Sequence, residues 1–186
     1  MRSLGSALGM SHMAVYHHFP GGREELIQVT TDSVVAQIRL PEPRSDWITW
    51  ILDLAENAFT TLSRFPGVAE QILTRHPVYV TSSVVGLIDA IMGALLDAGL
   101  DEAQAAEVWT VSETWLAGQL WITDATRNRP STTRADLSDA LGDSAVSAAN
   151  LLRVAEQLAG EVASTHLRSG LHDLLVGFRA RMARND

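Results

Sequence analysis

A short run of side chains near the N-terminus has the residue types that nucleic-acid recognition needs. His12, Met13, Tyr16 and His17 follow Ser11, and on a helix they fall on or near one face. Imidazole and phenol groups exchange hydrogen bonds with base edges, and histidine can gain charge beside phosphate because its pKa lies near neutrality. Ser11 begins the helix, so the helix N-terminus can face a phosphate. These residues predict a DNA-contact surface.

Two short helices joined by a glycine turn must position this surface. Apolar residues recur at helical spacing in the first helix: Leu4, Ala7 and Leu8. Gly9 ends that helix, because glycine adopts positive φ without a Cβ penalty. Ser11 caps the second helix, whose Ala14 and Val15 face inward. Such a pair lays its second helix in the major groove of DNA.

The string LGMSHMAVYHHF, followed by a polar turn and EELI, resembles the TetR (tetracycline-repressor-type) family of transcription regulators. The positions that match the family pattern are Leu8, Gly9, Ser11, Ala14, Tyr16, His18, Phe19 and Leu26. The resemblance covers the chain strongly to about Ile38 and loosely after that. It implies a small DNA-binding head and a helical body that holds an effector and dimerises.

Two features depart from the family pattern. The family has a complete helix before the one that opens this chain, so Leu4, Leu8 and Val15 are expected to lose apolar cover and DNA affinity to be weak or absent. The turn from Pro20 to Arg23 is one residue longer than usual. Arg23 is therefore the nearest candidate for a phosphate contact after that turn, and Arg2 is a second candidate.

Composition limits the function classes that this chain can belong to. Its 186 residues are 46% hydrophobic and 19% charged, with no cysteine and a net charge of −8. The acidic balance argues against a general DNA-coating protein, so the DNA prediction depends on the motif. Disulfide and thiolate chemistry are excluded. The sequence shows no secretory signal and no uninterrupted apolar run of about 18 residues, which predicts a cytoplasmic protein without a membrane partner.

The rest of the chain reads as helices separated by proline, glycine and polar segments, so the predicted fold class is all-α. Helices are expected over 23–38, 46–64 with Asp46 as cap, a short stretch to 74, 81–96, 102–126, 143–166 and 167–183. The polar segment 127–142 is expected to be a loop, and Gly170 a joint between terminal helices. The predicted domains are a head with its linking helix, 1–38, and a body, 39–186.

Aromatic and polar residues in the body suggest a small-molecule site. All five tryptophans lie between Trp47 and Trp121. The predicted effector-binding residues are Trp50, Asp53, Asn57, Trp109 and Glu113, with Gln71 added because the resemblance places it near a ligand contact. A carboxylate in an aromatic pocket would favour a cationic or hydrogen-bonding ligand. The alternatives are that the polar residues face solvent and that the tryptophans only pack the core.

The last helix carries an apolar stripe that predicts a subunit interface. Its string RSGLHDLLVGFRAR resembles the terminal helix of the same family, and Gly118 on the preceding long helix would permit close helix approach. The predicted homodimer residues are Trp115, Gly118, Ile122, Leu171, Leu174, Leu175 and Phe178. Pairing both helices with their symmetry mates gives a four-helix interface with two-fold symmetry. The alternative is that the stripe covers the subunit's own core.

The leading interpretation is a ligand-responsive repressor that binds double-stranded DNA as a homodimer. The alternative is a helical small-molecule-binding protein that does not bind DNA in this form. An enzyme has little support, because the chain lacks a cysteine nucleophile, a glycine-rich phosphate loop and an HExxH motif. No cofactor or metal is expected, and His76 has no second ligand at a suitable spacing.

Overall fold

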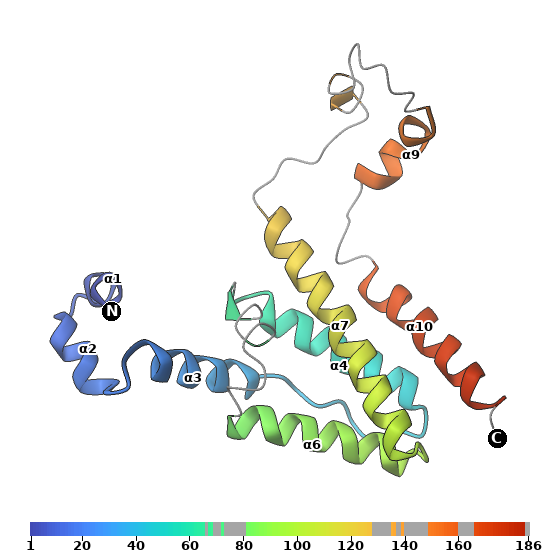
Figure 1. Cartoon of the computed structure of the whole chain (residues 1–186), viewed down its shortest axis with the longest axis horizontal. Helices are drawn as coiled ribbons and strands as arrows, with labels where there is room; N and C mark the ends of the chain where they lie inside the picture. The colour runs from blue at the N-terminus through green and yellow to red at the C-terminus, as the bar shows by residue number, and fades with distance from the viewer. Residues whose placement is uncertain are drawn as a thin grey trace.

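The computed structural model describes residues 1–65, 67–68, 72, 81–127, 135–136, 139, 149–159 and 166–184. All regular structure in these residues is helical, which confirms the all-α prediction. The helices are α1 (Arg2–Ala7), α2 (His12–His18), α3 (Gly22–Val35), α4 (Trp47–Leu62), α6 (Ser82–Asp97), α7 (Glu102–Thr126), α9 (Ala149–Ala159) and α10 (Leu167–Met182). Figure 1 shows α1 and α2 as a head that α3 joins to a body of α4, α6, α7 and α10.

The head has the predicted helical pair, and its turn is built as the sequence indicates. Gly9 has φ +66° and follows α1, while the Ser11 hydroxyl accepts a hydrogen bond from the Ala14 amide at 3.1 Å. Gly5 has a role that the sequence did not indicate. It is buried, and a Cβ built there would lie 2.8 Å from the carbonyl oxygen of Met10. The two helices therefore pack through backbone contact at Gly5.

The expected loss of apolar cover holds for one residue of the head and fails for another. Leu8 is 59% exposed, whereas Val15 is only 2% exposed. Leu4 is half-buried. Val15 lies on α2, which packs against α1, and its side chain is buried without any preceding helix. The prediction for Val15 was therefore wrong.

The linking helix α3 runs from Gly22 to Val35, so it ends before Ile38, the predicted last residue. It packs against α6 and α4 of the body. One contact joins α3 to the start of α6: the Asp32 carboxylate accepts a hydrogen bond from the Ser83 amide at 2.8 Å. Hydrogen bonds from the Thr81 hydroxyl and from Ser83 hold the pKa of Asp32 below its ordinary value. We call this contact the α3–α6 latch.

The core of the body is one apolar cluster of α4, α6, α7 and α10, in which α4 packs against α10 and α7, and α6 packs against α7. Most residues of α4 are apolar, and it buries side chains on several sides, including Ile48, Ile51 and Leu52. Asp46 occupies the N-cap position, and its carboxylate accepts a hydrogen bond from the Thr49 hydroxyl at 2.5 Å. The body thus has a continuous apolar interior of the kind that supplies most folding free energy.

A glycine lets α10 approach α7 closely. A Cβ built at Gly170 would lie 2.3 Å from the ring of Trp115, and the Trp115 indole nitrogen donates a hydrogen bond to the Leu167 carbonyl at 3.0 Å. Gly170 therefore lies within α10 and is not the predicted joint between helices. The indole fills the space that any larger residue at 170 would need.

The remaining elements follow the sequence in most places. Thr81 caps α6, and Asp101 with Gln104 forms a capping box at the start of α7. Within the predicted loop 127–142, the described residues Ala135, Asp136 and Asp139 have helical backbone, so the prediction was wrong there. The described part of the predicted helix 143–166 is α9, which lies apart from the body in Figure 1.

Candidate functional site

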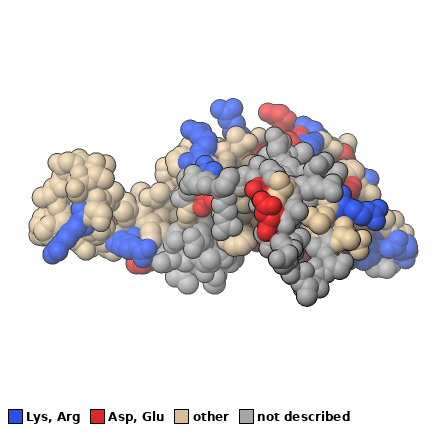
Figure 2. All heavy atoms as spheres, turned by 90° about the horizontal axis from the view of Figure 1, so that it is seen from above, with Lys and Arg blue, Asp and Glu red and all other residues tan. Residues whose placement is uncertain are grey.

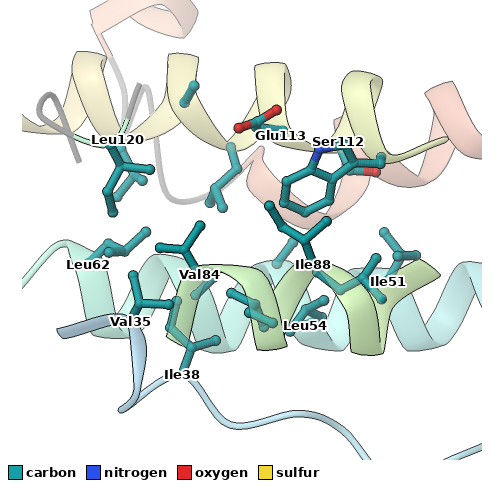
Figure 3. Close-up of a pocket in the computed structure, with 18 residues that line it drawn as sticks. Val35, Ile38, Ile51, Leu54, Leu62, Val84, Ile88, Ser112, Glu113 and Leu120 are labelled. Carbon is teal, nitrogen blue, oxygen red and sulfur yellow. The ribbon is translucent and has the colours of Figure 1, made fainter. Parts of the chain in front are cut away.

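A cavity of about 110 Å³ lies between the end of α3 and helices α4, α6 and α7. Figure 3 shows α7 along one side and α4 and α6 along the other, with Val35 and Ile38 contributed from the α3 end. Except for three residues of α7, every described lining residue is aliphatic. Small-molecule sites have this character, in which a few polar groups orient a ligand within an apolar enclosure.

The three exceptions occupy one turn of α7: Trp109, Ser112 and Glu113. Positions three and four apart on a helix lie on the same face, so these side chains are neighbours. Ser112 is 8% exposed, and its buried hydroxyl has no hydrogen-bond partner among the described residues. Glu113 is half-buried and forms no hydrogen bond or ion pair with any described residue. The cavity therefore offers two unpaired oxygen groups beside an indole.

The predicted effector residues divide between this cavity and other places. Trp109 and Glu113 line it. Trp50, Asp53 and Asn57 do not, because α4 turns a different face to the cavity than the one that carries these three residues. Gln71 lies outside the described residues.

The three residues outside the cavity make structural contacts within the body. The Trp50 indole nitrogen donates to the Pro41 carbonyl at 3.2 Å, and the Asn57 amide donates to the Arg39 carbonyl at 2.9 Å. Both bonds fasten the segment that follows α3 to α4. Asn57 and Trp50 thus make structural contacts within the subunit and do not line this cavity.

Asp53 likewise serves a structural ion-pair network. Its carboxylate lies 3.0 Å from the Arg44 guanidinium and 2.9 Å from that of Arg168, which also contacts Glu56 at 2.8 Å. Two arginines therefore already neutralise Asp53, and it faces α10 and the segment before α4. This network connects three parts of the body around one side of α4.

A second hollow, of about 400 Å³, lies between the segment after α3, the start of α4 and the last turns of α6. Trp47 and Trp50 line it together with small residues of α6, among them Gly93 and Ala94. Both tryptophans are buried in the core, so the hollow exposes little of either ring. We assign no ligand to it.

Sequence reasoning missed most of the cavity wall. Ser112 was not singled out, although it shares a helix face with Trp109 and Glu113. The aliphatic lining residues, such as Ile51 and Ile88, were not among the predicted effector contacts. Apolar periodicity shows which residues are buried, and it does not show which of them border empty space.

The predicted DNA-contact residues are all exposed in the structure. His12, Met13, Tyr16 and His17 lie on α2, and Met13 is 66% exposed. Tyr16 also lies against Gly22, where a Cβ would be 3.3 Å from its ring. Outside α2 the predicted contacts are Ser11, Arg2 and Arg23, at the α2 N-cap, the start of α1 and the first turn of α3. Figure 2 shows that the head carries few charged side chains.

The predicted interface residues also divide into two groups. Leu171, Leu175 and Phe178 are buried within a single subunit against α4 and α7, so they are corrected to core residues. Leu174, on the same helix, is 45% exposed. The alternative, that the stripe covers the subunit's own core, is thus right for the three buried residues.

The predicted interface residues on α7 are less buried than those on α10. Ile122 and Gly118 are half-buried, and nothing lies within 4 Å of a Cβ built at Gly118. Trp115 is half-buried and bonded to α10. Trp121, which the interface prediction omitted, is 70% exposed. An indole with this exposure is unusual on a surface that only water contacts.

The described residues contain neither a membrane-spanning helix nor a cluster of metal ligands. None of their helices is long and apolar enough to cross a membrane. No group of three or more histidine, aspartate or glutamate side chains in this part of the chain is arranged to hold a metal ion.

Comparison with known proteins supports the sequence resemblance. A family model described as the tetracyclin repressor-like C-terminal domain matches residues 40–182. The Streptomyces coelicolor TetR family protein ActR, solved in complex with actinorhodin, superimposes with a TM-score of 0.76 at 20% identity, covering 97% of this chain and 86% of ActR. Apo ActR gives a TM-score of 0.74 at 21% identity with the same coverage. A search of curated proteins found no match.

Proposed function

This chain belongs to the tetracycline repressor-like (TetR) family of regulators, and from that premise we propose that it is a ligand-responsive repressor that binds double-stranded DNA. Family membership places it among regulators rather than enzymes, with a ligand-binding C-terminal domain. We further propose that residues 1–38 form the DNA-binding head with its linking helix and that residues 39–186 form the body.

One observation carries the proposal: a single helix connects the two candidate sites. At its N-terminal end α3 follows α2, whose exposed face holds the predicted base-contacting residues. At its C-terminal end Val35 lines the cavity, and Ile38 follows just beyond it. A ligand that binds one arrangement of the cavity wall better than another shifts the population of α3 positions. The proposed coupling between the cavity and the head would act through α3, which connects them.

We propose that the protein acts as a homodimer on a palindromic operator. The interface would use the exposed faces of α7 and α10, with Trp115, Gly118, Ile122 and Leu174 of the original prediction and Trp121 added. Two-fold pairing would separate the recognition helices by about 34–36 Å or a multiple of it, the repeat of the DNA double helix. The effector would favour a dimer whose heads do not match this spacing.

The effector is proposed to be a small molecule. ActR is a TetR family protein whose solved complex contains actinorhodin, and it shares the fold of this chain. The cavity described above supports a ligand of limited size. Apolar cavities of about 150 Å³ bind benzene. The cavity of about 110 Å³ is of the same order and somewhat smaller, which supports a ligand of about one ring or a short chain.

DNA binding is tested by fluorescence anisotropy with DNA from the region upstream of the protein's own gene. We expect saturable binding that weakens as salt rises, because phosphate contacts release counterions. His17→Ala should weaken binding by about tenfold, since a base contact contributes roughly 1–3 kcal/mol. His172→Ala, an exposed histidine on α10, is the matched control and should leave affinity unchanged.

A second candidate is a helical small-molecule-binding protein that does not bind DNA in this form. The observation that favours it is the apolar exposure of the head, where Leu8 and Met13 both face solvent. The two candidates separate when the chain is compared with a form extended upstream of Met1. Absence of binding by both forms, with ligand binding intact, would establish the second candidate.

A further inference from the structure

The chemistry of the cavity points to one class of effector. We propose that it binds a small organic amine, whose ammonium group pairs with Glu113 and whose apolar part lies among the aliphatic residues. This inference rests on the proposed role of the cavity as the effector site, and it specifies the ligand class that the site accepts.

The charge of the cavity wall indicates a cationic ligand. Glu113 is the only charged residue among the described residues that line the cavity. It differs from Asp53, which two arginines already neutralise on the other side of α4. A half-buried carboxylate loses hydration without a compensating partner, so a cation brought beside it gains electrostatic energy that an uncharged ligand cannot. An anionic ligand would be repelled, because no described arginine, lysine or histidine lines the cavity.

The neighbours of Glu113 make the site specific for an ammonium group. An ammonium has three N–H donors and no acceptor, so it needs acceptors in several directions. The Ser112 hydroxyl oxygen is buried without a partner, and Trp109 offers an aromatic face that attracts cations. Carboxylate, hydroxyl and indole come from residues within one turn of α7, the helix on which Figure 3 labels Ser112 and Glu113. The ammonium group of the proposed ligand would bind at this turn of α7, with Glu113 as its charged partner.

The aliphatic wall determines the rest of the ligand. Residues of α3, α4 and α6, including Val35, Ile51 and Ile88, supply no hydrogen-bonding side chain. A polar ligand body would lose its hydration there without compensation. The volume of about 110 Å³ is of the same order as the roughly 150 Å³ of apolar cavities that bind benzene, which favours a ligand body of about one ring or a short alkyl chain. The proposed ligand is therefore a primary amine on a single ring or short chain.

Three probes of nearly equal size test this class: benzylamine, benzyl alcohol and benzoate. Binding to the full chain is measured by titration at neutral pH, with tryptophan indole NMR signals as the readout. We expect benzylamine to bind about 10- to 100-fold more tightly than benzyl alcohol, since hydrogen bonds to charged groups contribute roughly 1.5–3 kcal/mol. Benzoate should bind more weakly than either.

Variants of α7 test whether Glu113 causes the preference for benzylamine. Glu113→Gln should reduce the preference for benzylamine over benzyl alcohol to within about twofold, because the amide keeps the size and removes the charge. Glu102→Gln, in the first turn of the same helix and outside the cavity, should keep the wild-type preference. Ser112→Ala gives an independent check, with a smaller loss of benzylamine affinity and no change for benzyl alcohol.

The outcomes separate this inference from the proposed function. Equal or tighter binding of benzyl alcohol or benzoate by the wild-type chain would overturn the amine class and leave the cavity as an effector site. The same holds if Glu113→Gln keeps the wild-type preference. Failure of all three probes to bind would overturn both the amine class and the effector role of the cavity. DNA binding is measured separately and does not enter these results.

Discussion

The head and the body of this protein are stabilised in different ways. In α1 and α2 the buried residues are Gly5 and Val15, and the two helices meet through backbone at Gly5. In the body, most of α4 is buried, and α10 packs along it. Buried apolar area contributes roughly 25 cal/mol per Å². The body therefore supplies most of the folding free energy, and the head depends on a few close contacts.

This difference fits the tasks proposed for the two regions. A segment with few buried apolar contacts opens locally at a lower free-energy cost than the core does. The head can thus adjust to DNA while the body keeps its structure. The comparison makes a general prediction: substitutions in the body change global stability, and substitutions in the head change local protection and DNA affinity.

The largest effect is expected from a core leucine of the body. Leu171→Ala removes a side chain that is fully buried between α10, α4 and α7, and it should lower the free energy of unfolding by about 2–5 kcal/mol. Leu8→Ala makes the same change at an exposed site in the head and should cost less than about 0.5 kcal/mol. Urea unfolding measures both. Similar losses for the two variants would break the comparison.

A close contact in the head should give the next largest effect. Gly5→Ala places a Cβ against the Met10 carbonyl, which must shift, at a cost of about 1–3 kcal/mol. Hydrogen exchange should show lost protection in α1 and α2 with α4 unchanged, together with weaker DNA binding. Ser6→Ala, on the exposed side of α1, is the control. Lost protection in α4 would show that the head and body unfold together.

Removing a helix cap should have a smaller, local effect. Ser11→Ala deletes the hydrogen bond to the Ala14 amide and should cost about 1 kcal/mol. In the head this loss should raise hydrogen exchange throughout α2. The corresponding change in the body, Asp101→Ala at the start of α7, should affect only the first turn, because the core holds the remainder. If hydrogen exchange increased over the same length of helix in both variants, the head would not be less stable than the body.

The α3–α6 latch should give the smallest effect and a pH dependence of known sign. Hydrogen bonds from Thr81 and Ser83 lower the pKa of Asp32, so its stabilising contribution is complete well above the ordinary value of 3.8 and is lost as pH falls through the lowered pKa. Asp32→Asn should therefore lower the melting temperature slightly at pH 7. The difference from wild type should shrink near pH 3. Asp89→Asn, exposed on α6, is the control and should show no such pattern.

Local features were predictable from the sequence, and features that depend on tertiary contacts were not. Gly9, Ser11 and Asp101 act on backbone groups within a few residues, so residue type alone indicated their roles. The Asp32 latch joins residues 51 positions apart, and Gly170 meets Trp115 from another helix. A local sequence pattern does not show which residues so far apart in the chain come into contact.

The candidate site shows the same limit. Polar residues on both α4 and α7 interrupt apolar helices, so Asp53 and Glu113 had equal standing in the sequence. Only the packing reveals that Asp53 meets two arginines and that Glu113 meets the cavity. The leucines of α10 teach a similar lesson, because an apolar stripe specifies burial without specifying which surface covers it.

The length of α3 has a geometric consequence for any ligand in the cavity. Its 14 residues span about 21 Å at 1.5 Å per residue. For a rod of that length, a tilt of about ten degrees at the Val35 end moves the head by roughly 4 Å, comparable to the rise of one base pair. In a symmetric pair the two displacements add. A shift of side chains by less than their own width can thus change which spacing of DNA sites the protein fits.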